Sequence, residues 1–460
     1  MDDRGRVVGA THQSTGEEER MAEVQPLPGI RYAPGEPLVE LVTPPYDVIS
    51  QEAQARYYER NPHNIIRLEL GRDEPDDDAL DNKYTRAAML FAQWRLDGIL
   101  RQDAPALYLY EQRFTVEGAP HVKTNLLARV RLEPWEARVV LPHERTLPKP
   151  KEDRLRVMRA TAANLSPIMA LYDDPHDELA RSFVPLRRRE PDVAFTDEAG
   201  EEHRVWVVPD PILAATVATF FNARPLYIAD GHHRYETALA YRDEQRELRK
   251  GMPQEDAANF VLMALSSVED RGLVVLPTHR IIRNVASEAL TNLAERLGAY
   301  FTLEPLPPED IAQWQTALAN AGVAGNENAF VLVTPQGASL ARLSDAGRGT
   351  MAGVRVEGEQ PSEAWRTLDV AVLQELLLHR VLGIDDEAIR SGDFLTYTRD
   401  AGEAATAVRT GANGAALAAL LRPTPPAAMR DVARAGDRMP QKSTYFYPKL
   451  ITGLVINPLW

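Results

Sequence analysis

The sequence predicts a mixed α/β fold with two lobes, and three observations support this. Short apolar runs typical of strands alternate with segments of helical periodicity. At roughly 100–200 residues per domain, 460 residues have room for two to four domains. The pattern changes near residue 281, after which helices and strands alternate as in a second α/β unit. We therefore expect a disordered tail over residues 1–20, an N-terminal α/β domain over 21–280, a second α/β lobe over 281–425, and a C-terminal segment over 426–460 that returns to the functional site.

Composition narrows the class of protein. Hydrophobic residues make up 44% of the chain and charged residues 26%, which is ordinary for a globular protein. The net charge of −15 argues against non-specific binding to nucleic acid. The chain has no cysteine, which excludes thiolate nucleophiles and cysteine-bound metals. No run of 18 apolar residues and no apolar signal-peptide region is present, so we expect a cytoplasmic protein without a membrane partner. The oligomeric state stays open.

Capping residues and apolar spacing predict the helices. Ser50 fits an N-cap and Gly98 fits a position just after a helix end. The predicted helices span residues 51–60, 82–97, 152–163, 211–222, 231–250, 287–297, 308–321, 368–382 and 415–421.

Alternation and β-type apolar runs predict the strands. The stretch 173–202 gives no consistent signal. The predicted strands span residues 65–70, 168–172, 205–208, 225–229, 260–266, 273–276, 300–303 and 330–334, and a hairpin joins 106–116 to 122–132.

The first candidate site is the turn that joins the buried strand 225–229 to the next helix. Its sequence is Asp230-Gly231-His232-His233-Arg234. Gly231 permits unusual backbone dihedral angles, and the unpaired N–H groups of a helix start attract anions. Arg234 suits bidentate contact with a phosphate. The turn therefore predicts a phosphate site.

Two other interpretations of this turn are open. Asp230 is only an N-cap in one of them, and the histidines are ordinary surface residues. In the other, His232 and His233 chelate a metal, but adjacent helical residues point about 100° apart and do not share one ion comfortably. We therefore predict no metal-ligand set.

The second candidate is a basic run in an acidic chain. Its members are Arg145, Lys149, Lys151 and Arg154. Prolines keep this segment extended and its side chains spread apart. A phosphate- or carboxylate-binding arm and a solvated basic loop are equally compatible with it.

The third candidate lies near the end of the chain. It contributes Lys442, Ser443, Thr444 and Lys449, which flank a short aromatic strand. The run Lys-Ser-Thr is similar to the end of a P-loop, but the glycine-rich part is missing, so a Walker A site is excluded. A packed C-terminal strand is the alternative.

The fourth candidate is Asp47, which follows the rigid Pro44-Pro45-Tyr46. Its carboxylate is suited to a general base or a magnesium ligand. A turn-capping aspartate explains the local sequence equally well.

These four stretches, together with 61–70, resemble domain-of-unknown-function family 1015 (DUF1015), an uncharacterised prokaryotic family. The resemblance runs from about residue 21 to the C-terminus. The DGHHR run is also similar to the signature of the ParB/sulfiredoxin superfamily, especially its free-serine kinases. That similarity implies a ParB/sulfiredoxin-like core and a phosphate role for Gly231, His232, His233 and Arg234. The kinases need a catalytic carboxylate, for which Asp47, Glu69 and Asp230 are the candidates.

The resulting hypothesis is a nucleotide-dependent phosphotransferase acting on a small hydroxylated metabolite such as free serine, with ATP or ADP and Mg²⁺. Positioning and charge neutralisation are the main needs of phosphoryl transfer. The alternatives are a non-enzymatic nucleotide-binding switch and a hydrolase; a DNA-partition role is disfavoured by the net charge.

Two structural expectations follow. The stretches 39–70, 143–154, 226–236 and 439–449 should converge on one cleft. Arg234 should point into that cleft and be exposed, so Arg234→Ala should lower nucleotide affinity about 10–150-fold with little loss of stability. The alternative is an Arg234 that pairs with a structural carboxylate.

Overall fold

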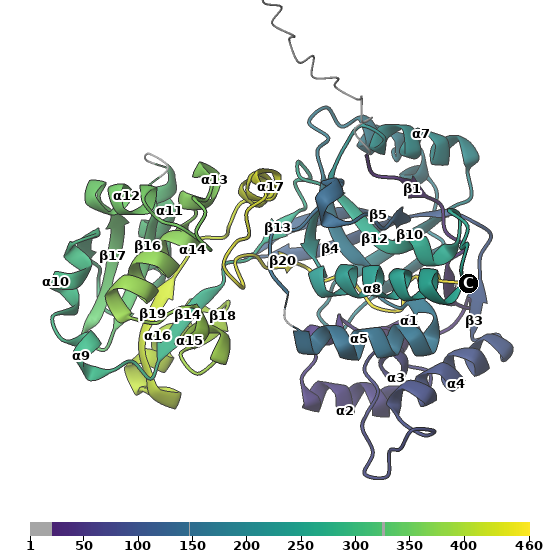
Figure 1. The fold of residues 1–460 in the computed structure, drawn as a ribbon, viewed down its shortest axis with the longest axis horizontal. Helices are drawn as coiled ribbons and strands as arrows, with labels where there is room; N and C mark the ends of the chain where they lie inside the picture. The colour runs from purple at the N-terminus through teal and green to yellow at the C-terminus, as the bar shows by residue number, and fades with distance from the viewer. Residues whose placement is uncertain (1–20, 147, 324–326) are drawn as a thin grey trace, which may run out of the picture.

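The computed structural model describes residues 21–146, 148–323 and 327–460, and the expected tail lies outside these ranges. Two β-sheets, each covered by helices, form two lobes side by side (Figure 1). The fold is therefore mixed α/β, as the sequence predicts. The domain boundaries stay a prediction. Within the described ranges, no helix combines the length and the apolar content needed to cross a membrane.

The larger lobe contains a nine-stranded sheet. Its strand order places β11 between β6 and β8, so the strand before the DGHHR turn is an interior one, as predicted. In sheet order the strands are β6 (Val140–Leu141), β11 (Leu226–Asp230), β8 (Ile168–Tyr172), β12 (Phe260–Ser267), β5 (Ala119–Arg131), β4 (Leu107–Val116), β10 (Glu202–Val208) and β9 (Val193–Thr196), with β1 (Val24–Gln25) paired to β5.

Both faces of this sheet are covered, which explains the uninterrupted apolar run of β11. Leu226 and Ile228 belong to one core with Tyr235 and Val217, whereas Tyr227 belongs to the core on the other face. The helix α8 (His232–Leu248) packs against α5 (Pro148–Thr161), which in turn packs against α4 (Lys83–Leu96) (Figure 1). The remaining longer helices of this lobe are α2 (Gln51–Arg60) and α7 (Pro211–Phe221).

The smaller lobe contains a six-stranded antiparallel sheet. Trp314 of α11 and Ala404 of α16 pack on one face with Val331. The strands, in sheet order, are β15 (Phe301–Pro305), β17 (Gly337–Leu343), β16 (Ala329–Thr334), β19 (Ala415–Leu420), β14 (His279–Arg283) and β18 (Leu395–Thr398). The main helices are α10 (Leu293–Gly298), α11 (Ile311–Val323), α12 (Asp345–Ala352), the π-helical stretch η5 (Leu373–Leu382) and α16 (Ala401–Thr410).

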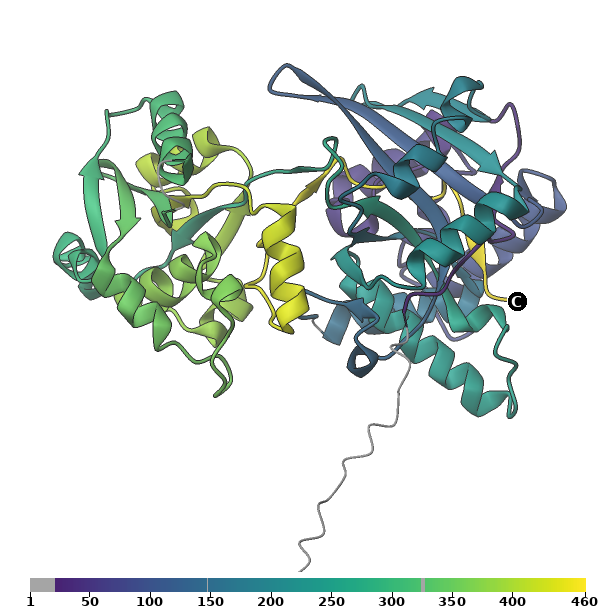
Figure 2. The ribbon, with the colours of Figure 1, turned by 90° about the horizontal axis from the view of Figure 1, so that it is seen from above.

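The chain crosses between the lobes twice. It leaves the larger lobe between β13 (Val274–Val275) and β14, and it returns through α17 (Pro426–Ala435). Figure 2 shows α17 between the lobes and the C-terminal segment continuing into the larger one. There β20 (Phe446–Tyr447) pairs with β13, and β21 (Asn457–Pro458) pairs with β7 (Ala163–Asn164). The last part of the chain therefore belongs to the larger lobe.

Several predicted elements differ from the structure. Residues 65–70 were expected as a strand, but Ile66–Glu69 is a helical turn, α3, whose first N–H is accepted by the side chain of Asn64. Residues 415–421 were expected as a helix, but β19 lies between β14 and β16, and pairing overrides the helix propensity of alanine. Left-handed Asn292 divides the expected helix 287–297 into α9 (Ser287–Leu290) and α10. The helix expected over 368–382 is α14 (Asp369–Val372) followed by the π-helical η5.

Candidate functional site

The start of α8 is the centre of the site. β11 ends at Asp230, and Gly231 turns the chain with φ of 95°, a left-handed conformation that suits glycine. A Cβ atom on Gly231 would lie 2.8 Å from Nε of Arg234. Within the described chain α8 has no side-chain cap, because its N-cap residue is Gly231. The positive end of a helix is thus left available to an anion.

Asp230 and its two cationic partners form a buried network beneath this turn. Arg234 and Lys449 each make an ion pair with the Asp230 carboxylate, and Arg234 also donates to the carbonyl oxygen of Pro167. Burial raises the pKa of Asp230, but the charges of Lys449 and Arg234 outweigh it and hold the pKa well below its usual range. Arg234 is only 9% exposed. The expectation of an exposed Arg234 was therefore wrong: it pairs with a carboxylate of its own motif.

The two histidines of the turn differ from each other. His232 is buried, and its Nε2 accepts from the backbone N–H of His143 at 3.2 Å. Burial lowers the pKa of His232 well below its usual value, so the ring is neutral and supplies no charge to an anion. His233 is half-buried, with the carboxylates of Glu144 and Glu236 acting on it. Burial lowers its pKa in spite of these carboxylates.

The three candidate carboxylates have different surroundings. Asp230 is locked as described above. Glu69 is buried, lies 3.5 Å from Nη1 of Arg154 and accepts from Ser166 at 3.1 Å. Asp47, in the 3₁₀ turn η1 (Tyr46–Val48), is exposed and has no hydrogen bond or ion pair to any residue that the structure describes. Its charge raises the pKa of Lys449 and acts on His233. Asp47 is thus the carboxylate with freedom to react.

Only some residues of the predicted basic run lie at the site. Lys151 pairs with Glu236 of α8 at 2.6 Å, and Thr146 donates to the same carboxylate at 2.7 Å. Arg154 is buried, and its guanidinium lies 4.1 Å from the centre of the Tyr46 ring. The side chain of Lys149 lies outside the described residues.

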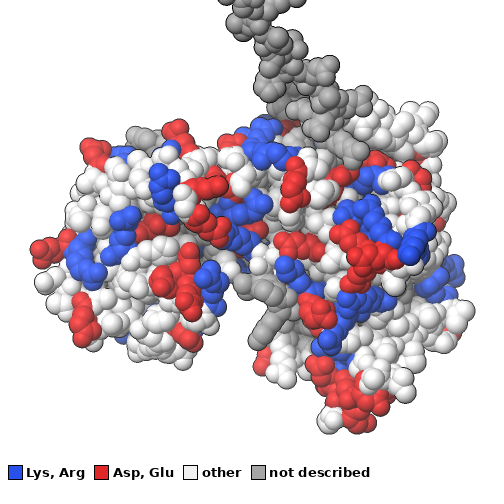
Figure 3. Space-filling model, in the orientation of Figure 1, with Lys and Arg blue, Asp and Glu red and all other residues white. Residues whose placement is uncertain are grey.

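Arg145 instead points to the other lobe. It forms an ion pair with Glu357 of the smaller lobe. On the face drawn in Figure 3, Lys and Arg side chains gather in the groove between the lobes, next to acidic side chains. Arg145 therefore connects the lobes in this structure, apart from the α8 turn.

The C-terminal stretch supplies one member of the ion network and one wall of the site. The backbone N–H of Lys442 donates to Glu144 at 2.9 Å, while the Lys442 side chain is exposed. Ser443 is buried and donates to the carbonyl oxygen of Pro440, which gives it a structural role. Thr444 lies 3.2 Å from Nε2 of His143. The structure thus brings all four stretches to the start of α8.

Two cavities border this arrangement. One, of about 890 Å³, lies between the lobes, and the other, of about 280 Å³, lies in the larger lobe next to Lys449. Val48 and Tyr445 line both cavities. The two cavities therefore share part of their walls, and one of the shared residues, Val48, directly follows Asp47 in the chain.

Several residues here had no sequence signal that singled them out. Glu144 and Glu236 sit next to candidate residues, but their roles depend on contacts with Lys442 and Lys151 that only the fold creates. Tyr445 was expected only as part of an aromatic strand, yet it lines both cavities.

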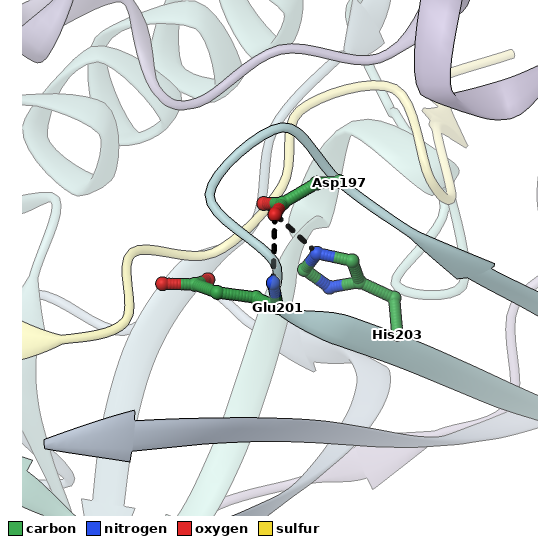
Figure 4. A group of neighbouring side chains, drawn as sticks. All are labelled: Asp197, Glu201 and His203. Atoms are coloured by element: carbon green, nitrogen blue, oxygen red, sulfur yellow. Dashed lines mark hydrogen bonds and ion pairs between the residues drawn. The ribbon is translucent and has the colours of Figure 1, made fainter. Parts of the chain in front are cut away.

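Asp197, Glu201 and His203 form a further polar group, most of which lies in the stretch without sequence signal (Figure 4). Their ligand-type atoms all lie within 4.8 Å of one another. Asp197 accepts the backbone N–H of Glu201 at 2.9 Å and lies 3.2 Å from Nε2 of His203, whereas the Glu201 carboxylate points away from that contact (Figure 4). The group is explained as a hydrogen-bonded turn.

Comparisons with known proteins give a family and a similarity of fold. The family described as "Protein of unknown function (DUF1015)" matches residues 24–371. Among solved structures, the chain is similar to a conserved hypothetical protein from Pyrococcus furiosus, with 13% identity and a TM-score of 0.32 over 68% of this chain and 88% of that one. It is also similar to free serine kinase in complex with AMP, with 12% identity and a TM-score of 0.33 over 67% and 83%. SbnI with a C-terminal truncation from Staphylococcus aureus shows 11% identity and a TM-score of 0.33 over 72% and 87%. The curated proteins gave no match.

Proposed function

We propose that this chain, which belongs to the DUF1015 family, is a nucleotide-dependent phosphotransferase that acts on a small hydroxylated metabolite such as free serine. The observation that carries the proposal is the arrangement at the start of α8. An uncapped helix N-terminus lies beside a partly buried cation network, and the charge of Asp47, a carboxylate with no partner among the described residues, acts on His233 and Lys449 of this arrangement. An anion site and a free base are what phosphoryl transfer to a hydroxyl group requires.

Each group has a distinct part in this proposal. The N–H groups of the first turn of α8 bind a phosphate of ATP or ADP. Arg234 and Lys449 are compensated by Asp230, so they fix the geometry of the turn. The hydroxyl oxygen of the acceptor forms a bond to the transferred phosphorus, and Asp47 accepts the proton of that hydroxyl. At the same time the bond between this phosphorus and the bridging oxygen of the nucleotide breaks.

A magnesium ion brought by the nucleotide would neutralise phosphate charge. Magnesium prefers carboxylate oxygen ligands, and Asp47 is the carboxylate here that has no competing partner among the described residues. The Asp47 carboxylate is therefore of a type that would hold Mg²⁺. This role would be an alternative to the proton transfer assigned to Asp47 above.

The test is incubation of the protein with Mg²⁺, free serine and ATP, ADP or CTP, followed by mass-spectrometric detection of phosphoserine. Phosphoserine that depends on both nucleotide and protein supports the proposal. Nucleotide binding without turnover overturns it in favour of the non-enzymatic switch. Release of inorganic phosphate that does not depend on an acceptor overturns it in favour of a hydrolase.

A further inference from the structure

The larger cavity is walled by both lobes. The smaller lobe contributes Tyr397 and Arg399 at the end of β18, and the returning segment contributes Lys442 and Tyr445. Its volume of about 890 Å³ lies within the range of roughly 300–1,000 Å³ that is typical of small-molecule sites. Sites at interfaces between structural units are common. This cavity is therefore large enough for more than a phosphate ion.

Two cations and two carboxylates line the cavity, and they differ in their contacts. Lys442 and Arg399 are exposed, and neither side chain forms an ion pair in the part of the chain that the structure describes, although the backbone N–H of Lys442 donates to Glu144. By contrast, the acidic side chains on the same wall are already engaged: Asp400 caps α16 by accepting the N–H of Gly402, and Glu403 accepts from Thr398. In a chain with a net charge of −15, two cations without such partners at one cavity are notable.

A third positive charge lies behind this wall. Arg280 is buried and donates to the carbonyl oxygen of Lys442 at 3.1 Å and to that of Thr278. It has no carboxylate partner in the described ranges. Lys442 itself has φ of 58°, the left-handed conformation that residues other than glycine seldom adopt. The backbone is thus held in a strained conformation at the point where the Lys442 side chain enters the cavity.

The remaining lining is aromatic and apolar. Tyr397 and Tyr445 supply ring faces, and Val48 and Ile311 supply aliphatic surface. The guanidinium of Arg399 lies 4.2 Å from the centre of the Tyr445 ring. Such a combination of rings, aliphatic carbon and cations matches a ligand with a flat base at one end and phosphates at the other.

The cavity is connected to the start of α8 by two contacts. Nζ of Lys449 lies 4.6 Å from the centre of the same Tyr445 ring, and Thr444 contacts His143. Val48 on the cavity wall directly follows Asp47. The residue that follows the proposed base therefore lines the cavity.

We propose that the interlobe cavity is the nucleotide site, with the base among Tyr397 and Tyr445 and the phosphates nearest the ribose at Lys442 and Arg399, so that the transferred phosphate extends from the cavity to the start of α8. This inference rests on the proposed function for the identity of the anion as a nucleotide. It assigns the cofactor to residues of the smaller lobe and the returning segment, beyond the DGHHR turn. The smaller cavity is then left for the acceptor.

Isothermal titration calorimetry with ADP and Mg²⁺ tests the assignment on the full chain. Arg399→Gln and Lys442→Asn remove the two cations, and asparagine tolerates the left-handed backbone at 442. Each variant should bind ADP about 10-fold more weakly, because each loses a charge-assisted contact. Arg188→Gln, an exposed arginine in the larger lobe and outside the cavity lining, is the matched control and should bind like the unchanged protein.

A space-filling variant gives a second, independent readout. Gln315 is exposed and lines the cavity from α11, so Gln315→Trp should fill part of it and weaken ADP binding without loss of thermal stability. The assignment is overturned if the unchanged protein binds ADP and if both charge variants and Gln315→Trp bind it with an affinity within twofold of that value. The proposed function would still stand in that case. Absence of binding of ADP and ATP to the unchanged protein overturns both.

Discussion

Asp230 and Lys449 form a partly buried ion pair although they are 219 residues apart in the chain. This pair attaches the C-terminal segment to the start of α8, and Arg234 completes the neutralisation of the Asp230 carboxylate. Arg234 and Lys449, which the sequence pattern assigned to a ligand, thus pair with a carboxylate of the protein itself. Asp47 remains without such a pairing among the described residues. The predictions below follow from this division.

Asp47→Asn should abolish most phosphoserine formation. The substitution removes the proposed base while keeping its size, so the rate should fall at least about 100-fold. The melting temperature should stay unchanged, because Asp47 is exposed and makes no contact with the described residues that stabilises the fold. Asp76→Asn, which alters an exposed carboxylate in a distant loop, is the control. Turnover that survives Asp47→Asn would remove Asp47 from the mechanism.

Arg234→Ala should destabilise the protein. It leaves Asp230 with one cation instead of two and removes a donor from the carbonyl oxygen of Pro167. Breaking a buried pair costs about 3 kcal/mol, and the remaining Lys449 keeps the expected loss near 2–3 kcal/mol. Urea denaturation of this variant and of Arg188→Ala measures the difference. Equal stability of the two variants would contradict a structural role for Arg234.

Gly231→Ala should also lower the free energy of unfolding, here by about 1–3 kcal/mol. The backbone at Gly231 is left-handed, and the added methyl group would press on the Arg234 guanidinium. Gly349, inside α12, has open space where a Cβ would lie and no positive φ, so Gly349→Ala should be neutral or slightly stabilising. Thermal melts of both variants test this difference. A melting temperature of Gly231→Ala equal to that of the unchanged protein would contradict the prediction.

His379 should make stability depend on pH in the alkaline range. Its ring lies 3.5 Å from Glu375 and 3.3 Å from Asp386. Burial lowers the pKa of His379, but these carboxylates outweigh it and raise the pKa to about 9. Since the folded pKa exceeds the unfolded value of about 6.5, the stabilisation is complete below about pH 6.5 and is lost as pH rises through about 9.

The measurement is the difference in unfolding free energy between the unchanged protein and His379→Gln from about pH 6 to about pH 10. Full conversion of the pKa shift would give roughly 3 kcal/mol, and partial exposure of the ring reduces the expected difference to about 1 kcal/mol. The difference should shrink as pH rises. A difference that is constant across this range would show that His379 does not titrate as stated.

Local signals in the sequence sufficed for the strand and helix around the DGHHR turn. The apolar run before Asp230 and the glycine after it define a strand, a turn and a helix start without reference to the rest of the chain. The secondary structure of Ala415–Leu420 could not be predicted from local sequence, because this alanine-rich segment forms a strand through pairing with β14 and β16.

The roles of the candidate residues also depend on contacts that are distant in the sequence. Proximity in sequence suggested that Arg234 serves a ligand, yet its burial depends on Pro167, which is 67 residues away. Ser443 resembled part of a phosphate motif, but its hydroxyl is used by the carbonyl oxygen of Pro440. Residue types therefore predicted the region of the site, whereas the fold decides which side chains remain available.

The return of the C-terminal segment has a consequence for biosynthesis. Lys449 is added to the growing chain 219 residues after Asp230. At about 5–20 residues per second, translation takes roughly 10–40 s to cover that interval. During that time Asp230 lacks one of the two cations that pair with it in the complete chain. The ion network at the start of α8 is therefore completed only late in translation.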